Sequence, residues 1–284
     1  MKNLSLFIVL LLTITLANPL QAQRKVLAAG SVKILPAVEA SARNEGTGTS
    51  LNRVAQAIDG QLIDALNGTR KFEIVARSDL DALLEEGGIS GQAVDPGEAD
   101  YLVVPVIDDF QDYVERAEFS AIGTVAQKRK LRLGMVARIY DTRTSRLIES
   151  TNFQLDNKHV ENLLQQSAKS GEYSDELLRQ IARDMAGQIA GRVLDVIFPA
   201  RILAMTGKQV TINRGDGTGI ALDQLWDVFA LGEELIDPDT GESLGRSEVM
   251  VGQVRVDRIT PRFSTATIVE DYGIEKNAVV RMAN

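Results

Sequence analysis

The sequence predicts an α/β domain, in which helices cover a mixed sheet, followed by a small all-β barrel. Apolar residues recur at helical spacing over residues 51–66, and residues 130–140 alternate apolar and polar side chains like a strand that pairs with residues 146–155. After Pro199 no segment has a helical pattern, and five or six short strand-like runs lie between turn signals. We therefore expect one domain at residues 23–199 and a second at residues 200–284.

The first 22 residues have the three-part order of a secretory signal peptide. Lys2 gives a positive start, an uncharged apolar run follows, and a cleavage region ends at Ala22. The run is short for a membrane span, although a retained anchor is the alternative because Leu20 is large for its place before the cut. Bacterial lipid anchoring acylates a cysteine, and the chain has Cys 0. We expect an exported, soluble, periplasmic protein with no lipid anchor.

Turn and capping residues divide the predicted α/β domain into elements. Ser50, Ser78 and Ser174 are the expected helix N-caps, since a serine hydroxyl accepts a hydrogen bond from a free backbone N–H. In order, we expect a β-prone opening (residues 25–38), a helix (51–68), a short strand (72–76), a second helix (78–88), a long strand (99–113), an antiparallel strand pair (130–140 and 146–155) and a third helix (174–199).

The third helix carries small residues on part of its surface, so that another element can approach it closely. These are Ala182, Ala186, Gly187, Ala190 and Gly191.

A Gly-dense segment, residues 214–219, opens the predicted β domain. As a phosphate loop it lacks the Gly-Lys-Ser/Thr ending, and as a dinucleotide fingerprint its glycines have the wrong spacing. Arg214, Gly215 and Asp216 match an adhesion tripeptide that short sequences often contain by chance. We expect a tight hairpin connection in which glycines supply positive φ angles. The strands of this domain are expected at residues 209–213, 225–230, 249–259, 264–269 and 278–282.

The charge balance argues against a nucleic-acid partner. Lys+Arg 31 against Asp+Glu 39 gives a net charge of -8, whereas a phosphate-backbone binder needs a clustered basic face. The one short basic cluster, residues 128–130, is expected to be a solvated strand entry.

The sequence contains no recognisable catalytic or metal-binding set, and we predict a protein that is not an enzyme and has no cofactor. Zinc sites built from Cys and His need more such residues than His159 alone, and His159 lies in a polar segment. Carboxylate-only hydrolysis stays open, but no residues can be assigned to it. Asp237, Asp239 and Glu242 suggest calcium, yet an ordinary surface turn is expected there, and Trp226 is expected in the core. We thus assign no catalytic, cofactor-binding or metal-binding residue.

Residues 72–86, FEIVARSDLDALLEE, form a strand that ends near an arginine and a helix with the pattern Asp-Leu-x-x-Leu-Leu-x-Glu. Together with residues 99–103, the hairpin at residues 139–148 and the Ala-rich third helix, this segment resembles the CsgG-type curli-secretion superfamily. That group includes lipoprotein activators of penicillin-binding proteins and the TolB N-terminal fold. The resemblance covers residues 25–199. It implies a ring-forming pore with long inserted hairpins, but residues 110–130 leave room for only a short hairpin.

The last domain resembles the C-terminal SH3-like domain of the flagellar assembly protein FlgT. Residues 210–213, 226–228 and 237–241 carry this resemblance. Together the two resemblances imply a non-catalytic periplasmic adaptor or assembly factor of a cell-envelope complex, which serves secretion, cell-wall synthesis or the flagellum. The implied partners are envelope proteins or further copies of the chain. The alternative is an outer-membrane-associated transport or pore component of the curli-secretion type.

Overall fold

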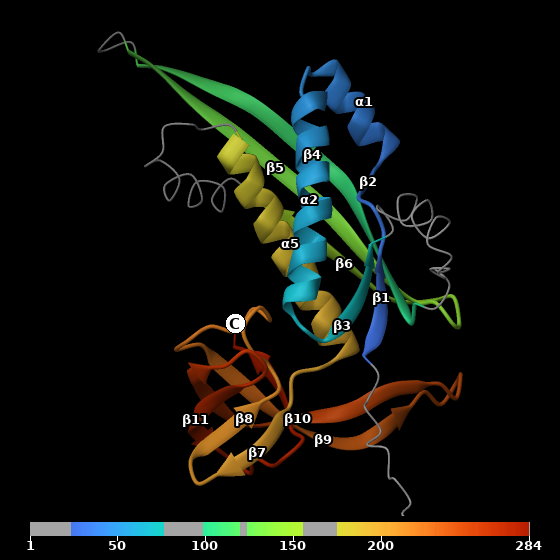
Figure 1. The fold of residues 1–284 in the computed structure, drawn as a ribbon, viewed down its shortest axis with the longest axis vertical. Coiled ribbons are helices and arrows are strands. Elements are labelled where there is room, and N and C mark those ends of the chain that lie inside the picture. The colour runs from blue at the N-terminus through green and yellow to red at the C-terminus, as the bar shows by residue number, and fades with distance from the viewer. Residues whose placement is uncertain (1–23, 77–98, 120–123, 156–174, 284) are drawn as a thin grey trace, which may run out of the picture.

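The computed structural model describes residues 24–76, 99–119, 124–155 and 175–283 (Figure 1). Within these ranges the chain forms two six-stranded sheets and three helices, and the helices lie on one face of the first sheet. This arrangement confirms the mixed α/β class. The predicted signal peptide, the helix at residues 78–88, Ser174 and His159 lie outside the described residues.

The first sheet has the strand order β3-β1-β4-β5-β6, with β2 paired to β4. Strand β1 runs parallel to β3 and β4, whereas β4, β5 and β6 are antiparallel neighbours. The elements of this domain are β1 (Lys25–Ala29), β2 (Lys33–Ile34), α1 (Pro36–Asn44), α2 (Gly48–Gly68), β3 (Phe72–Ala76), β4 (Tyr101–Phe119), β5 (Thr124–Asp141), β6 (Arg146–Leu155) and α5 (Asp175–Ile197).

The core of this domain lies between the sheet and the two long helices. Apolar residues spaced three and four apart place one face of α2 and one face of α5 against the sheet, as the sequence predicts. Strand β5 contributes every second residue to the same core, from Leu131 to Ile139. The small residues of α5 allow the close packing, since Ala182, Ala186 and Ala190 are all buried.

Helix α1 was not predicted, and α2 begins earlier than predicted. The expected β-prone opening is interrupted at Pro36, which occupies the first turn of α1, where its missing N–H costs no hydrogen bond. Glu39 in the first turn and Arg43 in the last turn suit the helix dipole and form an ion pair of 2.9 Å. Helix α2 has Thr47 as its N-cap and no side-chain cap hydrogen bond, so the assignment of Ser50 as N-cap is wrong.

The β4–β5 hairpin is longer than the short hairpin expected within residues 110–130. Backbone pairing continues from Phe110 opposite Leu133 to Phe119 opposite Thr124, so the ribbon extends beyond the helices (Figure 1). Charged residues do not interrupt these strands, because a two-stranded antiparallel ribbon can expose both faces to water. The register places Glu115 opposite Lys128, and the basic cluster at residues 128–130 therefore lies inside β5 rather than at its start.

The second sheet has the strand order β12-β9-β10-β11-β8-β7. Residues 200–283, all of which are described, contain no helix, as predicted. The first strand was missed, and β9 and β10 are longer than expected. The strands are β7 (Ile202–Thr206), β8 (Gln209–Ile212), β9 (Leu225–Ile236), β10 (Ser243–Ile259), β11 (Ser264–Asp271) and β12 (Val279–Met282).

The two ends of this sheet meet but do not form a continuous ladder. An isolated bridge joins Arg201 to Val279, and Ile202 and Val280 donate backbone hydrogen bonds of 3.0 and 2.9 Å to Ala278 and Ala200. A closed SH3-like barrel is therefore not confirmed. Buried side chains from the strands of this sheet and the segments between them form a second hydrophobic core, which includes Trp226. The domain limits themselves, residues 23–199 and 200–284, stay predictions.

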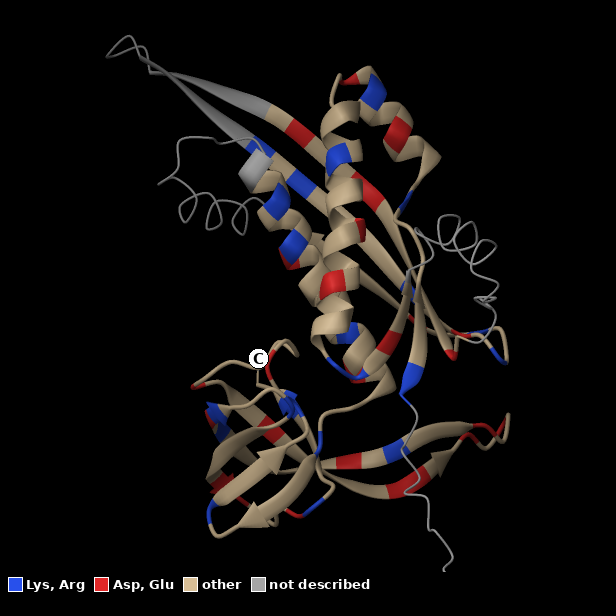
Figure 2. Cartoon of the chain, in the orientation of Figure 1, with Lys and Arg blue, Asp and Glu red and all other residues tan. Residues whose placement is uncertain are grey.

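The extra length of β9 and β10 forms an arm, residues 230–249, in which the two strands pair only with each other (Figure 1). Leu235, Ile236 and Leu244 on this arm are 47%, 54% and 65% exposed. Acidic residues gather toward its end (Figure 2). The arm therefore presents apolar side chains to solvent within an acidic setting.

Two ion pairs between elements make the stability of the fold depend on pH. Arg192 on α5 donates to Glu149 on β6 at 2.6 Å, and Arg281 on β12 donates to Glu248 on β10 at 2.8 Å. These hydrogen bonds lower the pKa of both glutamates below 4.5. A lowered carboxyl pKa stabilises the fold above the unfolded pKa, and this stabilisation is lost as the pH falls through the folded pKa.

We expect the variant E149Q/E248Q to be less stable than wild type at pH 7 and to lose less stability between about pH 5 and pH 3. Urea denaturation across this range measures the difference. If the unfolding free energies of wild type and E149Q/E248Q fell in parallel with pH, these two ion pairs would not be the source of the pH dependence.

Candidate functional site at the domain junction

The Gly-dense segment is not the hairpin connection that the sequence predicts. It joins β8 to β9, and these two strands are not neighbours in the sheet. Instead the segment packs against the end of α2 and the turn between β10 and β11. Gly217 and Gly219 do have positive φ angles, of 79° and 81°, as expected.

Arg214, at the start of this segment, is fully buried and holds the second domain against the end of α5. Its Nη2 atom donates hydrogen bonds of 2.6 Å to Asp195 Oδ1 and 2.7 Å to the Phe198 carbonyl oxygen. A cation is favourable here because the C-terminal end of a helix carries partial negative charge. Burial lowers the pKa of Arg214, and the Asp195 carboxylate opposes that shift. A side chain with this burial is not available as an exposed adhesion motif.

Close backbone packing completes the contact between the domains. Arg70, just after α2, donates to the Pro261 carbonyl oxygen at 2.9 Å. A Cβ atom on Gly215 would lie 2.7 Å from backbone atoms of Pro261 and Arg262, and a Cβ on Gly217 would lie 2.6 Å from the Gly68 carbonyl oxygen. Glycine is therefore required at both positions for lack of space.

We expect Gly217→Ala to destabilise the protein more than Gly219→Ala. Both glycines have positive φ, so each alanine incurs the cost of a left-handed backbone, about 1–2 kcal/mol. Only the alanine at 217 also clashes with Gly68, because a Cβ on Gly219 meets nothing within 4 Å. The difference between the two unfolding free energies, measured in urea, isolates the contact between the domains. Equal losses would show that this contact contributes nothing.

A groove of about 720 Å³ lies at this junction, between α2, α5 and the Gly-dense segment. Its α5 side combines small and polar residues, which are Gly187, Ala190 and Gly191 and then Gln180, Arg183, Asp184 and Gln188. Arg183 also lies 3.5 Å from Gln61 on α2, measured from its Nε atom to Oε1. The lining residues are Ala65, Thr69, Gln180, Arg183, Asp184, Gly187, Gln188, Ala190, Gly191, Gly217, Thr218, Gly219 and Met282.

The acidic segment at residues 237–242 and Trp226 both have roles in the fold. Asp237 Oδ1 accepts hydrogen bonds from the backbone N–H groups of Asp239 and Thr240, at 2.8 and 3.1 Å, and so forms the turn at the end of the arm. No group of three or more His, Cys, Asp or Glu residues suited to a metal ion occurs in the described residues. Trp226 is 6% exposed and lies in the second core, as predicted.

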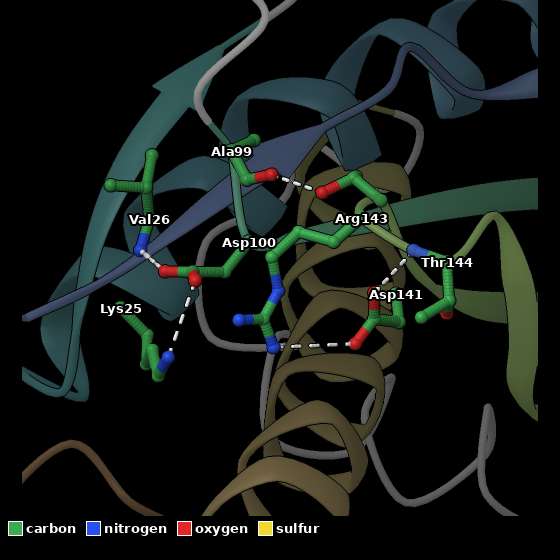
Figure 3. Close-up of polar contacts among 8 residues, drawn as sticks. Lys25, Val26, Ala99, Asp100, Asp141, Arg143 and Thr144 are labelled. Atoms are coloured by element: carbon green, nitrogen blue, oxygen red, sulfur yellow. Dashed lines mark hydrogen bonds and ion pairs between the residues drawn. The ribbon is translucent and has the colours of Figure 1, made fainter.

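A polar cluster ties the start of β1 and β4 to the β5–β6 turn (Figure 3). Asp100 accepts hydrogen bonds from the Lys25 ammonium at 3.2 Å and from the Val26 N–H at 3.0 Å. Asp141 accepts one from the Thr144 N–H at 2.9 Å, which lowers the pKa of its carboxyl group. Arg143 also lies 3.7 Å from the Asp141 carboxylate. Both carboxylates are thus bound by a backbone N–H group and a cationic side chain, and we regard the cluster as structural.

Sequence reasoning missed the groove as a site, although it noted the small residues of α5 that line part of it. It had no signal for the burial of Arg214, because this depends on how the two domains meet. None of the described helices is long and apolar enough to cross a membrane.

No protein-family model matches the sequence. No curated protein matches it either. Among solved structures, the chain is similar to the PelC dodecamer from Paraburkholderia phytofirmans, with 10% identity, a TM-score of 0.31, and coverage of 61% of this chain and 87% of that one. It is also similar to lipoprotein GNA1162 from Neisseria meningitidis, with 11% identity, a TM-score of 0.26, and coverage of 58% and 98%.

A third similar structure is TolB from Acinetobacter baumannii, with 10% identity, a TM-score of 0.29, and coverage of 92% of this chain and 61% of that one. With TM-scores and identities this low, these likenesses neither place the chain in a family nor assign it a function. None of the three is a CsgG-type pore or FlgT, so those narrower resemblances stay predictions.

Proposed function

We propose that this protein is an exported, non-catalytic adaptor that binds a segment of a cell-envelope protein in the groove between its two domains. The groove is the observation that carries the proposal. Its volume is about 720 Å³, and its lining combines small residues, such as Gly187 and Gly191, with polar ones, such as Gln188. Binding surfaces between proteins likewise combine apolar and polar groups.

The groove is well suited to binding because its walls are held in place before a partner arrives. Arg214 fixes the Gly-dense segment to the end of α5, and the Gly217–Gly68 contact fixes the same segment to α2. A partner that enters such a preformed groove loses less free energy to ordering of the site. The exposed apolar side chains of the arm offer a second surface for an assembly.

Site-specific crosslinking in cells tests the proposal. A photo-crosslinking residue at Gln188, which lines the groove, should capture an envelope protein, whereas the same residue at Asn52, an exposed position on α2 outside the groove, should not. If the captured protein belongs to secretion, cell-wall synthesis or flagellar assembly, its identity would also show which pathway this chain serves. Equal capture from both positions, or capture of nothing, would contradict an adaptor that works through the groove.

A transport component of the curli-secretion type is the second candidate function. The length of the β4–β5 hairpin favours it, because backbone pairing reaches Phe119 and Thr124. In that case the crosslinked product would be a closed ring of this chain in the membrane fraction. Recovery of the whole protein in the soluble osmotic-shock fraction would dismiss this function.

A further inference from the structure

A second pocket at the junction, of about 270 Å³, is lined by four basic residues that come from separate parts of the chain. Arg24 precedes β1, Arg70 and Lys71 lie between α2 and β3, and Arg262 lies in the β10–β11 turn. Figure 2 shows basic residues in the turn after α2, where the two domains meet. Such a convergence is unexpected in a chain of net charge -8.

These cations are not neutralised within the described part of the chain. No acidic residue lines the pocket there, and Arg24, Lys71 and Arg262 form no ion pair in the described residues. Arg70 is committed in part, since its Nη1 atom donates to the Pro261 carbonyl oxygen at 2.9 Å. Like charges held together without counter-charges repel each other, so a bound anion would stabilise the arrangement.

Arg214, which is paired with Asp195, lies next to the pocket lining residue Gly215. It is fully buried, and its Nη1 atom has no hydrogen-bond partner in the described structure. Its charge reaches Lys71, because the pKa of Lys71 is lowered first by burial and then by Arg214. Arg214 does not itself line the pocket, so its part here is electrostatic and the contacts to a ligand would come from the four basic lining residues.

We infer that this basic pocket binds a phosphoryl group. Three arginines and one lysine line it, and a phosphoryl group offers several acceptor oxygens with up to two negative charges. Arginine binds such oxygens in pairs, and lysine adds a point charge. At about 270 Å³ the pocket has room for one such group. The inference does not rest on the adaptor function, because the groove and the pocket have different lining residues apart from Thr69.

Calorimetry with inorganic phosphate tests whether the pocket binds a free phosphate anion. We expect the wild-type chain to bind phosphate at low ionic strength, and K71Q/R262Q to bind it at least about tenfold more weakly, because the variant lacks two of the four cationic groups that line the pocket. The control K208Q/R255Q removes one lysine and one arginine from exposed positions outside the pocket and should bind like wild type. Thermal unfolding checks that both variants fold.

Vesicle flotation distinguishes the source of the phosphoryl group. If the natural ligand is a lipid headgroup, wild type and K208Q/R255Q should float with phosphatidylglycerol vesicles, and K71Q/R262Q should not. Phosphate binding without vesicle binding would support a soluble phosphorylated ligand. Absence of both, or equal losses in the pocket variant and the control variant, would overturn the inference.

Discussion

Replacing Asp195 with alanine is expected to cost more stability than replacing its buried partner Arg214 with methionine. The Arg214 side chain is 1% exposed, whereas that of Asp195 is 56% exposed. Removal of Asp195 leaves a buried guanidinium without its counter-charge, which typically costs about 3–5 kcal/mol. Removal of Arg214 leaves a carboxylate that water can solvate, and methionine refills much of the volume, so we expect a loss of about 1–2 kcal/mol at most.

Trp226 provides the measurement, since it is the one tryptophan of the chain and lies in the core of the second domain. Its fluorescence in a urea titration follows the unfolding of that domain directly. Glu39→Ala is the matched control, because Glu39 pairs with Arg43 on the surface of α1 and its loss should cost less than about 1 kcal/mol. A larger loss for R214M than for D195A would show that the volume of Arg214 matters more than its charge.

The consequence for function follows from where the ion pair lies. Asp195 lies in the last turn of α5, Phe198 directly follows that helix, and Arg214 belongs to the segment that forms a wall of the groove. D195A should therefore loosen the groove as well as the fold. Proteolysis near residues 199–201, where α5 leads into the second domain, should be faster in D195A than in wild type.

The elements predicted correctly from the sequence are those whose pattern is local. The alternation that specifies β5, the turn that returns the chain into β6 and the apolar stripes of α2 and α5 depend only on nearby residues, and the structure confirms these elements. Helix α1 was missed because its nine residues include no large apolar side chain besides Val38, and only the position of Pro36 marked its start.

The site was less predictable because it depends on contacts between the domains. Arg214 looks like part of an exposed turn in the sequence, and only the end of α5 explains its burial. Gly215 and Gly217 suggest a turn, yet both are needed chiefly because backbone from another element approaches them closely. No periodicity within the chain encodes such approaches.

The groove can be tested by filling it without weakening the fold. Gly187 lies on α5 in the groove wall, and a Cβ atom there meets nothing within 4 Å. Gly187→Ala should stabilise the protein by about 0.5–1 kcal/mol, because glycine is a poor helix former and no contact is disturbed. Gly187→Phe should also fold, since phenylalanine has a better helix propensity than glycine, but its ring would occupy the space that a partner needs.

Gly60 on α2 is the matched control, because it is also an exposed helical glycine with nothing within 4 Å and does not line the groove. We expect G187F to abolish crosslinking from Gln188 and G60F to preserve it, while thermal unfolding shows both variants folded. Even about 1.4 kcal/mol of lost contact free energy weakens binding roughly tenfold. Unchanged capture by G187F would mean that the partner binds elsewhere, and the exposed apolar arm would then be the surface to substitute.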